Sequence, residues 1–213
     1  MRLNRSGRLL FRCGYPSVDA GSGWDTGRML DSTPKKKLAL CIPTPGDVHE
    51  LFEMYSDPRL AEADPLIAHT SIEHTEAVLR RRISEWTQHG LGPWVLRILH
   101  GAQAGEFVGI GGCSLRADTA WNLAFSLRPR HWGRGYAQEV AAAGMERAHA
   151  IRPDLPITAV VATRNTRSQR AVERAGLHTV WEGPDSHDPD PTATILLYAD
   201  RALSDEQICV LTG

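Results

Sequence analysis

The sequence predicts one α/β (α+β) domain with a mixed, mostly antiparallel central sheet and helices on both faces. Short runs of strand-like alternation are interspersed with longer helical patterns, and Gly- and Pro-containing turns separate them. The chain has 213 residues, of which 42% are hydrophobic, enough for one well-cored domain. Its formal net charge of -1 gives no field that would attract nucleic acid or an anionic membrane, so we expect a small or locally recognised substrate.

The domain is expected to span residues 37–203. Residues 1–36 are rich in Gly, Ser and Arg and predict a flexible extension, within which Met29 is an alternative start. Residues 204–213 are expected to form a C-terminal tail. The four cysteines are scattered, with no Cys-x-x-Cys pair and no His cluster at metal-ligand spacing, so we expect reduced thiols in a cytoplasmic protein and no metal.

The first elements are a strand and two helices. Residues 38–42 alternate weakly and are followed by proline, as expected for a strand. Asp47 opens a helix whose apolar face ends where Asp57-Pro58 breaks the pattern. Thr70 or Ser71 can cap a second helix with an apolar stripe that includes Leu79 and Trp86.

A pair of strands follows. Residues 93–99 place Trp94, Leu96 and Ile98 on one face, and Gly101 turns the chain toward residues 106–115. This pattern is typical of an antiparallel pair.

A strand, a glycine-containing loop and a helix form the centre of the chain. Leu123, Phe125 and Leu127 lie on one face of the strand, and from Tyr136 the apolar residues recur at helical spacing. Two glycines in a loop before a helix leave backbone N–H groups exposed at the positive end of the helix dipole, which favours a phosphate ligand. Arg130 and Arg134 add cationic donors, although ordinary turn chemistry explains the glycines equally well on spacing alone.

Two common phosphate loops do not fit this segment. A P-loop needs Lys and then Ser or Thr after its last glycine, whereas Tyr136 and Ala137 follow Gly135. A dinucleotide-binding loop needs a third small residue where Gln138 stands.

The last part of the chain predicts a strand, a helix and a hairpin. Residues 157–162 are β-branched and apolar, and Asn165 can cap a short helix that ends near Gly176. Residues 180–182 and 194–198 are expected to be the final strands, joined by a polar loop.

Two segments together resemble a known family. Arg130-His131-Trp132-Gly133-Arg134-Gly135-Tyr136-Ala137 resembles the Arg/Gln-x-x-Gly-x-Gly/Ala pyrophosphate loop of GNAT-type N-acyltransferases. Asn165-Thr166-Arg167-Ser168, followed by Ala171 to Leu177, is similar to the Asn-x-x-Ser…Gly-Phe segment of their RimJ/RimL-like branch. The resemblance covers roughly residues 37–203, and it implies a GNAT-like sheet flanked by helices.

The resemblance implies acetyl-CoA as cosubstrate and direct acetyl transfer to an amine in a ternary complex. It implies that backbone N–H groups of the loop hold the pyrophosphate and that the strand before it holds the pantetheine arm. Asn165 would contact that arm as well as cap its helix, and Ser168 would protonate the leaving thiolate. The implied cofactor-binding residues are Phe125, Ser126, Leu127, Arg130, His131, Trp132, Gly133, Arg134, Gly135, Tyr136, Ala137 and Asn165, and the implied catalytic residue is Ser168.

The catalytic base is a point where the chain departs from the branch. RimJ/RimL-like proteins often have Glu-Ile-Gly-Tyr in the fourth strand, whereas this chain has Asn122-Leu123-Ala124-Phe125, so a carboxylate is missing. Glu106, Asp185 and His187 are substitutes that the sequence does not rank.

The leading hypothesis is therefore an N-acetyltransferase for a protein N-terminus, an amino acid or a small amine. We expect neither nucleic acid nor a membrane as its partner. A homodimer is left open. The missing carboxylate favours an alternative, a non-catalytic CoA-binding or sensing module. A nucleotide-binding module is a third hypothesis.

Overall fold

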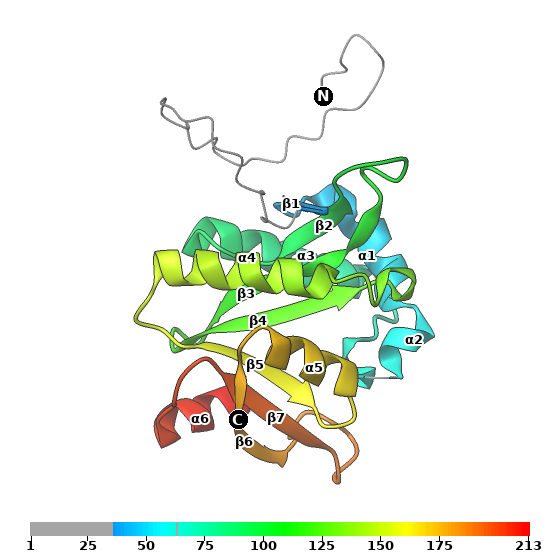
Figure 1. Cartoon of the computed structure of the whole chain (residues 1–213). Helices are drawn as coiled ribbons and strands as arrows, with labels where there is room; N and C mark the ends of the chain where they lie inside the picture. Colours follow the sequence, from blue (N-terminus) through cyan, green and yellow to red (C-terminus); the bar gives the residue numbers. More distant parts are fainter. Residues whose placement is uncertain (1–35, 63) are drawn as a thin grey trace, which may run out of the picture.

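The fold is built on a seven-stranded sheet with the order β1-β2-β3-β4-β5-β7-β6 (Figure 1). The computed structural model describes residues 36–62 and 64–213, so the predicted extension lies outside the described residues except for Lys36. All neighbouring strands are antiparallel except β4 and β5, so the sheet is mixed and mostly antiparallel, as the sequence predicts. The strands are β1 (Leu38–Cys41), β2 (Trp94–Ile98), β3 (Phe107–Arg116), β4 (Ala120–Leu127), β5 (Ile157–Ala162), β6 (His178–Pro184) and β7 (Thr194–Ala199).

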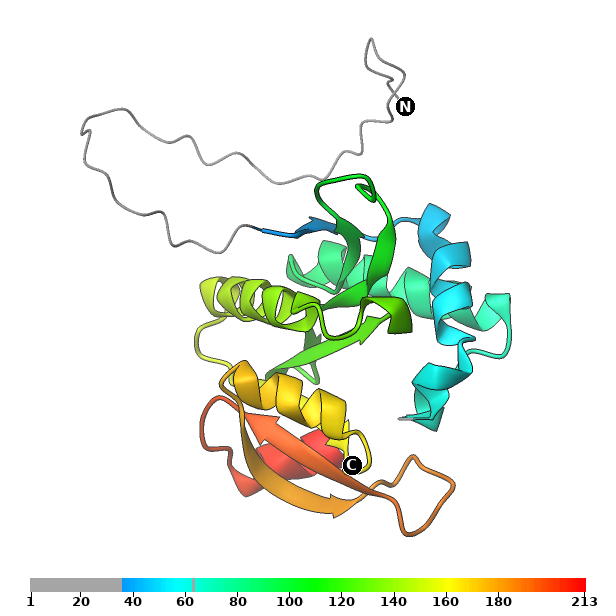
Figure 2. The same cartoon turned by 45° about the vertical axis from the view of Figure 1, so that its right-hand side comes forward.

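Helices cover both faces of the sheet, which confirms the predicted architecture. In Figures 1 and 2, α4 and α5 lie on one face, while α1, α3 and α6 lie on the other. The α-helices are α1 (Val48–Tyr55), α2 (Pro58–Ala61), α3 (Ile72–His89), α4 (Tyr136–Ile151), α5 (Thr166–Arg174) and α6 (Asp205–Thr212), and the 3-10 helices are η1 (Pro45–Asp47), η2 (Pro65–Ile67) and η3 (Pro129–His131).

Side-chain caps fix where several of these helices begin. Of the two predicted caps for α3, Ser71 is the one used, and its hydroxyl accepts a hydrogen bond from the His74 N–H. Asp57 does not simply end α1, because its carboxylate accepts from the Arg59 N–H and begins the short helix α2. Pro58 fits there since the first turn of a helix needs no N–H donor.

The core between α4 and the sheet matches the predicted periodicity. Tyr136, Val140 and Ala148 of α4 are buried in the same cluster as Leu123 and Leu127 of β4. Helix and sheet approach closely at Gly144, where an added Cβ would lie 3.2 Å from the backbone nitrogen of Cys113. Close packing at this position fixes the middle of α4 against β3.

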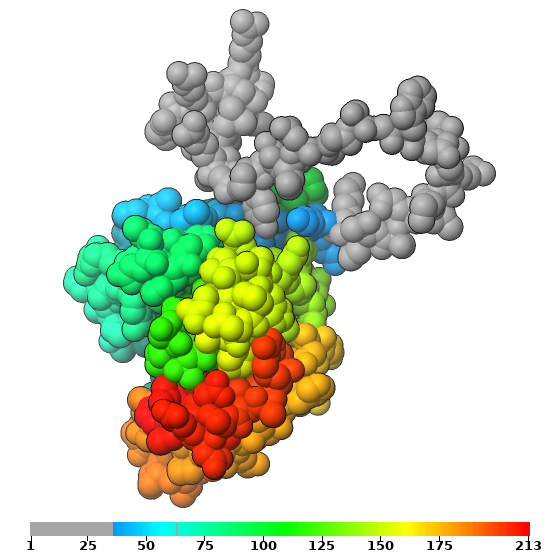
Figure 3. Space-filling model, turned by 90° about the vertical axis from the view of Figure 1, so that its left-hand side faces the viewer, coloured from blue at the N-terminus to red at the C-terminus, as the bar shows by residue number. Residues whose placement is uncertain are grey.

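Residues 204–213 fold as a helix where the sequence analysis expects a tail. Ser204 and Gln207 form a reciprocal capping box at the start of α6. Leu211 is fully buried in a cluster with Ala120 and Leu197. Figure 3 shows the last residues, in red, packed against the rest of the domain rather than extending from it. A helix of two turns gives too short an apolar pattern to be identified from sequence.

Replacing Leu211 with Ala should lower the free energy of unfolding by about 2 to 5 kcal/mol, because it leaves a cavity at a fully buried position. Urea unfolding measures this loss. Val210→Ala is the matched control, since the neighbouring Val210 side chain is exposed and should change little. Equal stability of the Leu211 variant and wild type would show that α6 is not part of the packed domain.

Two of the cysteines are free thiols, as the sequence predicts. Cys113 is buried and Cys209 is exposed. Cys13 lies outside the described residues. Among the described residues, no helix is long and apolar enough to cross a bilayer.

Candidate functional site

The two parallel strands in the middle of the sheet separate along their length. β4 and β5 pair only at Trp121 with Ile157 and at Asn122 with Thr158. Beyond Asn122, β4 continues to Leu127 without a partner on this side, while β5 continues along β7. The main chain of β4 from Leu123 to Leu127 is therefore available to bond a ligand along this edge.

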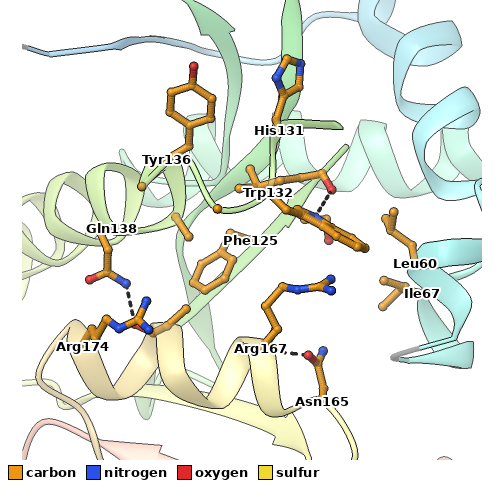
Figure 4. A pocket seen from close by; sticks show the side chains of 17 residues that line it. Leu60, Ile67, Phe125, His131, Trp132, Tyr136, Gln138, Asn165, Arg167 and Arg174 are labelled. Carbon is orange, nitrogen blue, oxygen red and sulfur yellow. Dashed lines mark hydrogen bonds between the residues drawn. The ribbon is translucent and has the colours of Figure 1, made fainter. Parts of the chain in front are cut away.

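A cavity of about 360 Å³ lies at this divergence (Figure 4). Its walls come from β4, the loop after it, the start of α4, one face of α5 and two residues of the α2–η2 region. It brings together most of the residues that the sequence analysis selects. These are Phe125, Ser126, Leu127, His131, Trp132, Gly133, Gly135, Tyr136, Ala137, Asn165 and Ser168.

The loop between β4 and α4 has the geometry of an anion site. Gly133 and Gly135 have φ of 74° and 81°, in the left-handed region that glycine adopts without strain. Gly135 is the N-cap residue of α4. In the described part of the chain, the N–H groups of Gly133, Gly135, Tyr136 and Ala137 donate no hydrogen bond. Free donors at the positive end of a 16-residue helix suit a phosphate.

Contacts with β1 and with the end of β4 hold the loop between β4 and α4 in place. Figure 4 shows the side chains of His131 and Tyr136 pointing away from the cavity, so these residues contribute through their backbone. The Trp132 indole Nε1–H donates to the Leu127 carbonyl at 2.8 Å. Lys37 Nζ donates to the Arg134 carbonyl at 3.3 Å, while the Glu139 carboxylate accepts from the Lys37 and Leu38 N–H groups. These contacts tie β1 to the first turn of α4 and preorganise the loop.

Arg130 and Arg134, two of the cofactor-binding residues that the resemblance implies, do not line the cavity. The Arg130 guanidinium forms an ion pair with Glu106 at 2.8 Å, and Arg134 is exposed. His131 Nε2 lies 3.2 Å from the same Glu106 carboxylate. Burial lowers the pKa of His131 although Glu106 opposes this, so the ring is neutral at pH 7. Glu106 thus holds the back of the loop and turns Arg130 away from the cavity.

Helix α5 places the two predicted polar residues at the cavity. The Asn165 side-chain oxygen accepts from the Ser168 N–H at 3.1 Å, which confirms Asn165 as the N-cap. Ser168 lines the cavity, and its hydroxyl forms no hydrogen bond within the described residues. It is therefore free to bond a ligand.

Six lining residues were not selected from the sequence. Leu60 and Ile67 lie at one end of the cavity, to the right in Figure 4, in a segment without periodicity, so no sequence signal identifies them. Gln138 directly follows the loop. Helical spacing places the remaining three on one face of α5, but it does not say that this face meets the cavity. They are Arg167, Ala171 and Arg174.

The wall near Ile67 is fixed by a stack of rings. His69 lies face to face with Tyr55 at 4.2 Å between ring centroids, and its Nδ1 is 2.9 Å from the Thr75 hydroxyl. Because that hydroxyl donates to the Ser71 carbonyl, His69 Nδ1 carries the proton. Burial raises the pKa of Tyr55, partly offset by Ser126 and Arg82. Tyr55 thus joins this wall to the cavity residue Ser126 as a neutral phenol.

Stability should depend on His69 between about pH 6.5 and 4. Burial and then His74 lower the pKa of His69 to about 4, below its value of about 6.5 in an unfolded chain. The unfolded state therefore binds the extra proton first, so stability is complete above pH 6.5 and is lost as the pH falls. His69→Asn keeps a side-chain N–H donor but does not titrate. Between pH 6.5 and 4, its free energy of unfolding should therefore fall by about 1 to 3 kcal/mol less than that of wild type. His100→Asn, at an exposed turn, is the control and should follow wild type. Plots of unfolding free energy against pH that run parallel for His69→Asn and wild type would contradict the prediction.

None of the three candidate bases lines the cavity. Glu106 is paired with Arg130, and Asp185 accepts a hydrogen bond from the His187 N–H. The His187 side chain is exposed. In residues 36–62 and 64–213, no group of His, Cys, Asp and Glu could hold a metal ion.

Comparison with known proteins identifies relatives of this arrangement. A family model described as an acetyltransferase (GNAT) domain matches residues 37–178. The uncharacterized protein YkkB of Bacillus subtilis is 28% identical in an alignment 110 residues long, which covers 46% of this chain and 62% of YkkB. The chain therefore matches less than two thirds of the length of that relative.

Solved structures share the fold at low identity. An acetyltransferase of the GNAT family from Bacillus anthracis aligns with a TM-score of 0.63 at 18% identity, over 77% of this chain and 94% of that one. RimL, a ribosomal L7/L12 α-N-protein acetyltransferase in complex with coenzyme A, aligns with a TM-score of 0.63 at 17% identity, over 78% and 94% of the two chains. At these identities the likeness establishes the fold.

Proposed function

We propose that this chain transfers an acetyl group from acetyl-CoA to a primary amine, because it belongs to the GNAT acetyltransferase family. Members of this family are acyl-CoA-dependent N-acetyltransferases. The observation that supports this most is the cavity between the diverging strands β4 and β5, with the unpaired N–H groups of the glycine loop on its wall. A diphosphate on the loop would direct a pantetheine arm along the free edge of β4. The proposed cofactor-binding residues are those that line this path, Phe125 to Leu127, His131 to Gly133, Gly135 to Ala137, and Asn165.

We propose direct transfer in a ternary complex rather than through an acyl-enzyme. A covalent route needs an activated nucleophile next to a base. Burial raises the pKa of the Cys113 thiol to about 12, so this group is not a thiolate at neutral pH. Neither Cys113 nor Cys209 lines the cavity. These observations favour attack by the amine itself on the thioester carbon.

The nitrogen of the acceptor loses two protons in this reaction, and the sulfur gains one. The ammonium form first loses a proton to water, since none of the candidate bases lines the cavity. The neutral amine then forms the new C–N bond, and the C–S bond breaks. We assign protonation of the departing thiolate to Ser168, which lines the cavity and whose hydroxyl bonds to no described residue. The second proton lost by the nitrogen restores the Ser168 hydroxyl.

The acceptor is proposed to be a protein N-terminal α-amine, an amino acid or a small amine. The segment from Asn165 to Leu177, which resembles the RimJ/RimL-like branch, favours the peptide α-amine. RimL itself is described as an α-N-protein acetyltransferase, and the shared fold is compatible with that acceptor.

Thiol release from acetyl-CoA, measured with a panel of peptides, amino acids and polyamines, tests the proposal. Release that depends on one class of amine supports it, with mass spectrometry of the product confirming an N-acetyl group. Binding of acetyl-CoA without turnover on any amine would favour a CoA sensor instead. Tighter binding of ATP or NAD than of CoA would favour a nucleotide-binding module.

A further inference from the structure

The cationic side chains at the cavity come from α5 and not from the glycine loop. Arg130 is paired with Glu106, and Arg134 does not line the cavity. Arg167 and Arg174 do line it, with Ala171 between them on the same face of α5. Spacings of four and three residues place all three on one side of the helix, and Figure 4 shows Arg167 and Arg174 along it.

Neither guanidinium is neutralised by an acidic side chain in the described part of the chain. No salt bridge between described residues includes Arg167 or Arg174. Arg167 is the second residue of α5, and the first turn of this helix contains no acidic residue. A cation is disfavoured there because it lies at the positive end of the helix dipole. Its position therefore does not serve the stability of α5.

Trp132 holds the Arg167 guanidinium at the beginning of the loop. The guanidinium carbon lies 3.5 Å from the centroid of the Trp132 ring system, which is close cation–π stacking. The indole is fixed in turn by its hydrogen bond to the Leu127 carbonyl. Stacking leaves the N–H donors at the edge of the guanidinium plane available for an anion.

Arg174 lies at the other end of the same helix face. Gln138 in the first turn of α4 donates to the Ala171 carbonyl at 2.8 Å, and this bond joins α4 to the middle of α5. Arg167 and Arg174 are on either side of this contact, about 10 Å apart along the helix axis. The unpaired N–H groups of the glycine loop belong to the same cavity.

We propose that Arg167 and Arg174 bind phosphate groups of acyl-CoA and that they supply the charge which Arg130 does not. The inference rests on the proposed function, since it takes CoA as the ligand. CoA carries a diphosphate and a separate 3′-phosphate, and both are bound well by the planar donor array of arginine. Two guanidinium groups along one helix face can reach both groups or share one.

Calorimetric titration of four proteins with CoA and with 3′-dephospho-CoA tests this. Arg167→Ala and Arg174→Ala should each weaken CoA binding about tenfold to a hundredfold, the effect of losing a charged hydrogen bond. Arg170→Ala is the matched control, because Arg170 is an exposed arginine of α5 that does not line the cavity. It should change affinity less than about twofold. If a variant binds CoA more weakly than wild type but binds 3′-dephospho-CoA equally well, the replaced arginine contacts the 3′-phosphate. If its affinity is reduced for both ligands, the arginine contacts the diphosphate.

Other outcomes separate this inference from the proposed function. Wild-type affinity in both variants, with melting curves that show folded protein, overturns the inference, while the proposed function stands if wild type still acetylates an amine. No CoA binding by wild type contradicts the proposed function itself. If Arg167→Ala raises only the KM for the amine, its guanidinium serves the acceptor, and the assignment to phosphate is wrong for that residue. Arg→Lys variants should fall between wild type and Ala.

Discussion

Gly135→Glu is expected to reduce acetyl-CoA affinity by at least about a hundredfold while the domain remains folded. The new carboxylate would lie at the N-cap of α4, where the proposed diphosphate sits, and like charges at this distance repel strongly in a partly enclosed site. An added Cβ makes no clash at this position, because its nearest neighbour would be Lys37 Nζ at 3.9 Å. The remaining effect on stability is the left-handed φ of 81°, which costs about 1 to 2 kcal/mol for a non-glycine residue.

Gly101→Glu is the control for this experiment. Gly101 also has a left-handed φ, 88°, and an added Cβ there meets nothing within 4 Å. It belongs to the turn between β2 and β3 and does not line the cavity. Both variants should lose similar stability, and only Gly135→Glu should lose acetyl-CoA binding by calorimetry. Unchanged affinity in Gly135→Glu would reject the loop as the phosphate site.

Ser168→Ala should lower kcat about ten- to a thousandfold with acetyl-CoA affinity nearly intact. A proton donor to the departing sulfur acts on charge that develops only as the thioester breaks, so its loss appears in kcat rather than in binding. The unpaired hydroxyl of Ser168 at the cavity is the structural basis for this expectation. Steady-state kinetics with the best amine, together with a melting curve on the same sample, measure both effects.

A purely structural role for Ser168 predicts a different result. Its N–H, not its hydroxyl, is bonded to Asn165, so alanine should keep the cap and cost about 1 kcal/mol or less. Thr166→Ala is the matched control, because Thr166 is a hydroxyl residue in the same helical turn that does not line the cavity. Wild-type kcat in a slightly destabilised Ser168 variant would exclude the general-acid role.

The central strand, loop and helix were predictable because local patterns determine them. Alternation at Leu123 and Leu127, the two loop glycines and the helical spacing from Tyr136 all agree with the observed elements. Asn165 as a cap follows in the same way from local side-chain chemistry. These features depend on neighbours in sequence, and tertiary packing reinforces them.

Other parts of the site depend on contacts between distant segments. Arg130 precedes the loop glycines in sequence. In the fold, however, Glu106, which directly precedes β3, forms an ion pair with Arg130. Leu60 and Ile67 form a wall although their segment has no apolar period. Arg167 and Arg174 share a helix face by spacing alone, but only the position of α5 against α4 makes that face part of the cavity. Such assignments need the fold.

The most direct test of the account is to locate acetyl-CoA on the protein by amide chemical shifts in an NMR titration of the ¹⁵N-labelled chain. We expect the largest changes at Phe125 to Leu127 in β4, at Gly133 to Ala137 in the loop, and at Asn165 and Ser168 at the start of α5. These residues line one cavity and are separated in sequence, so a shared response would identify it as the binding site. Changes concentrated instead around Leu115 and Arg152, which line a separate cavity, or no change at saturating acetyl-CoA, would contradict the account.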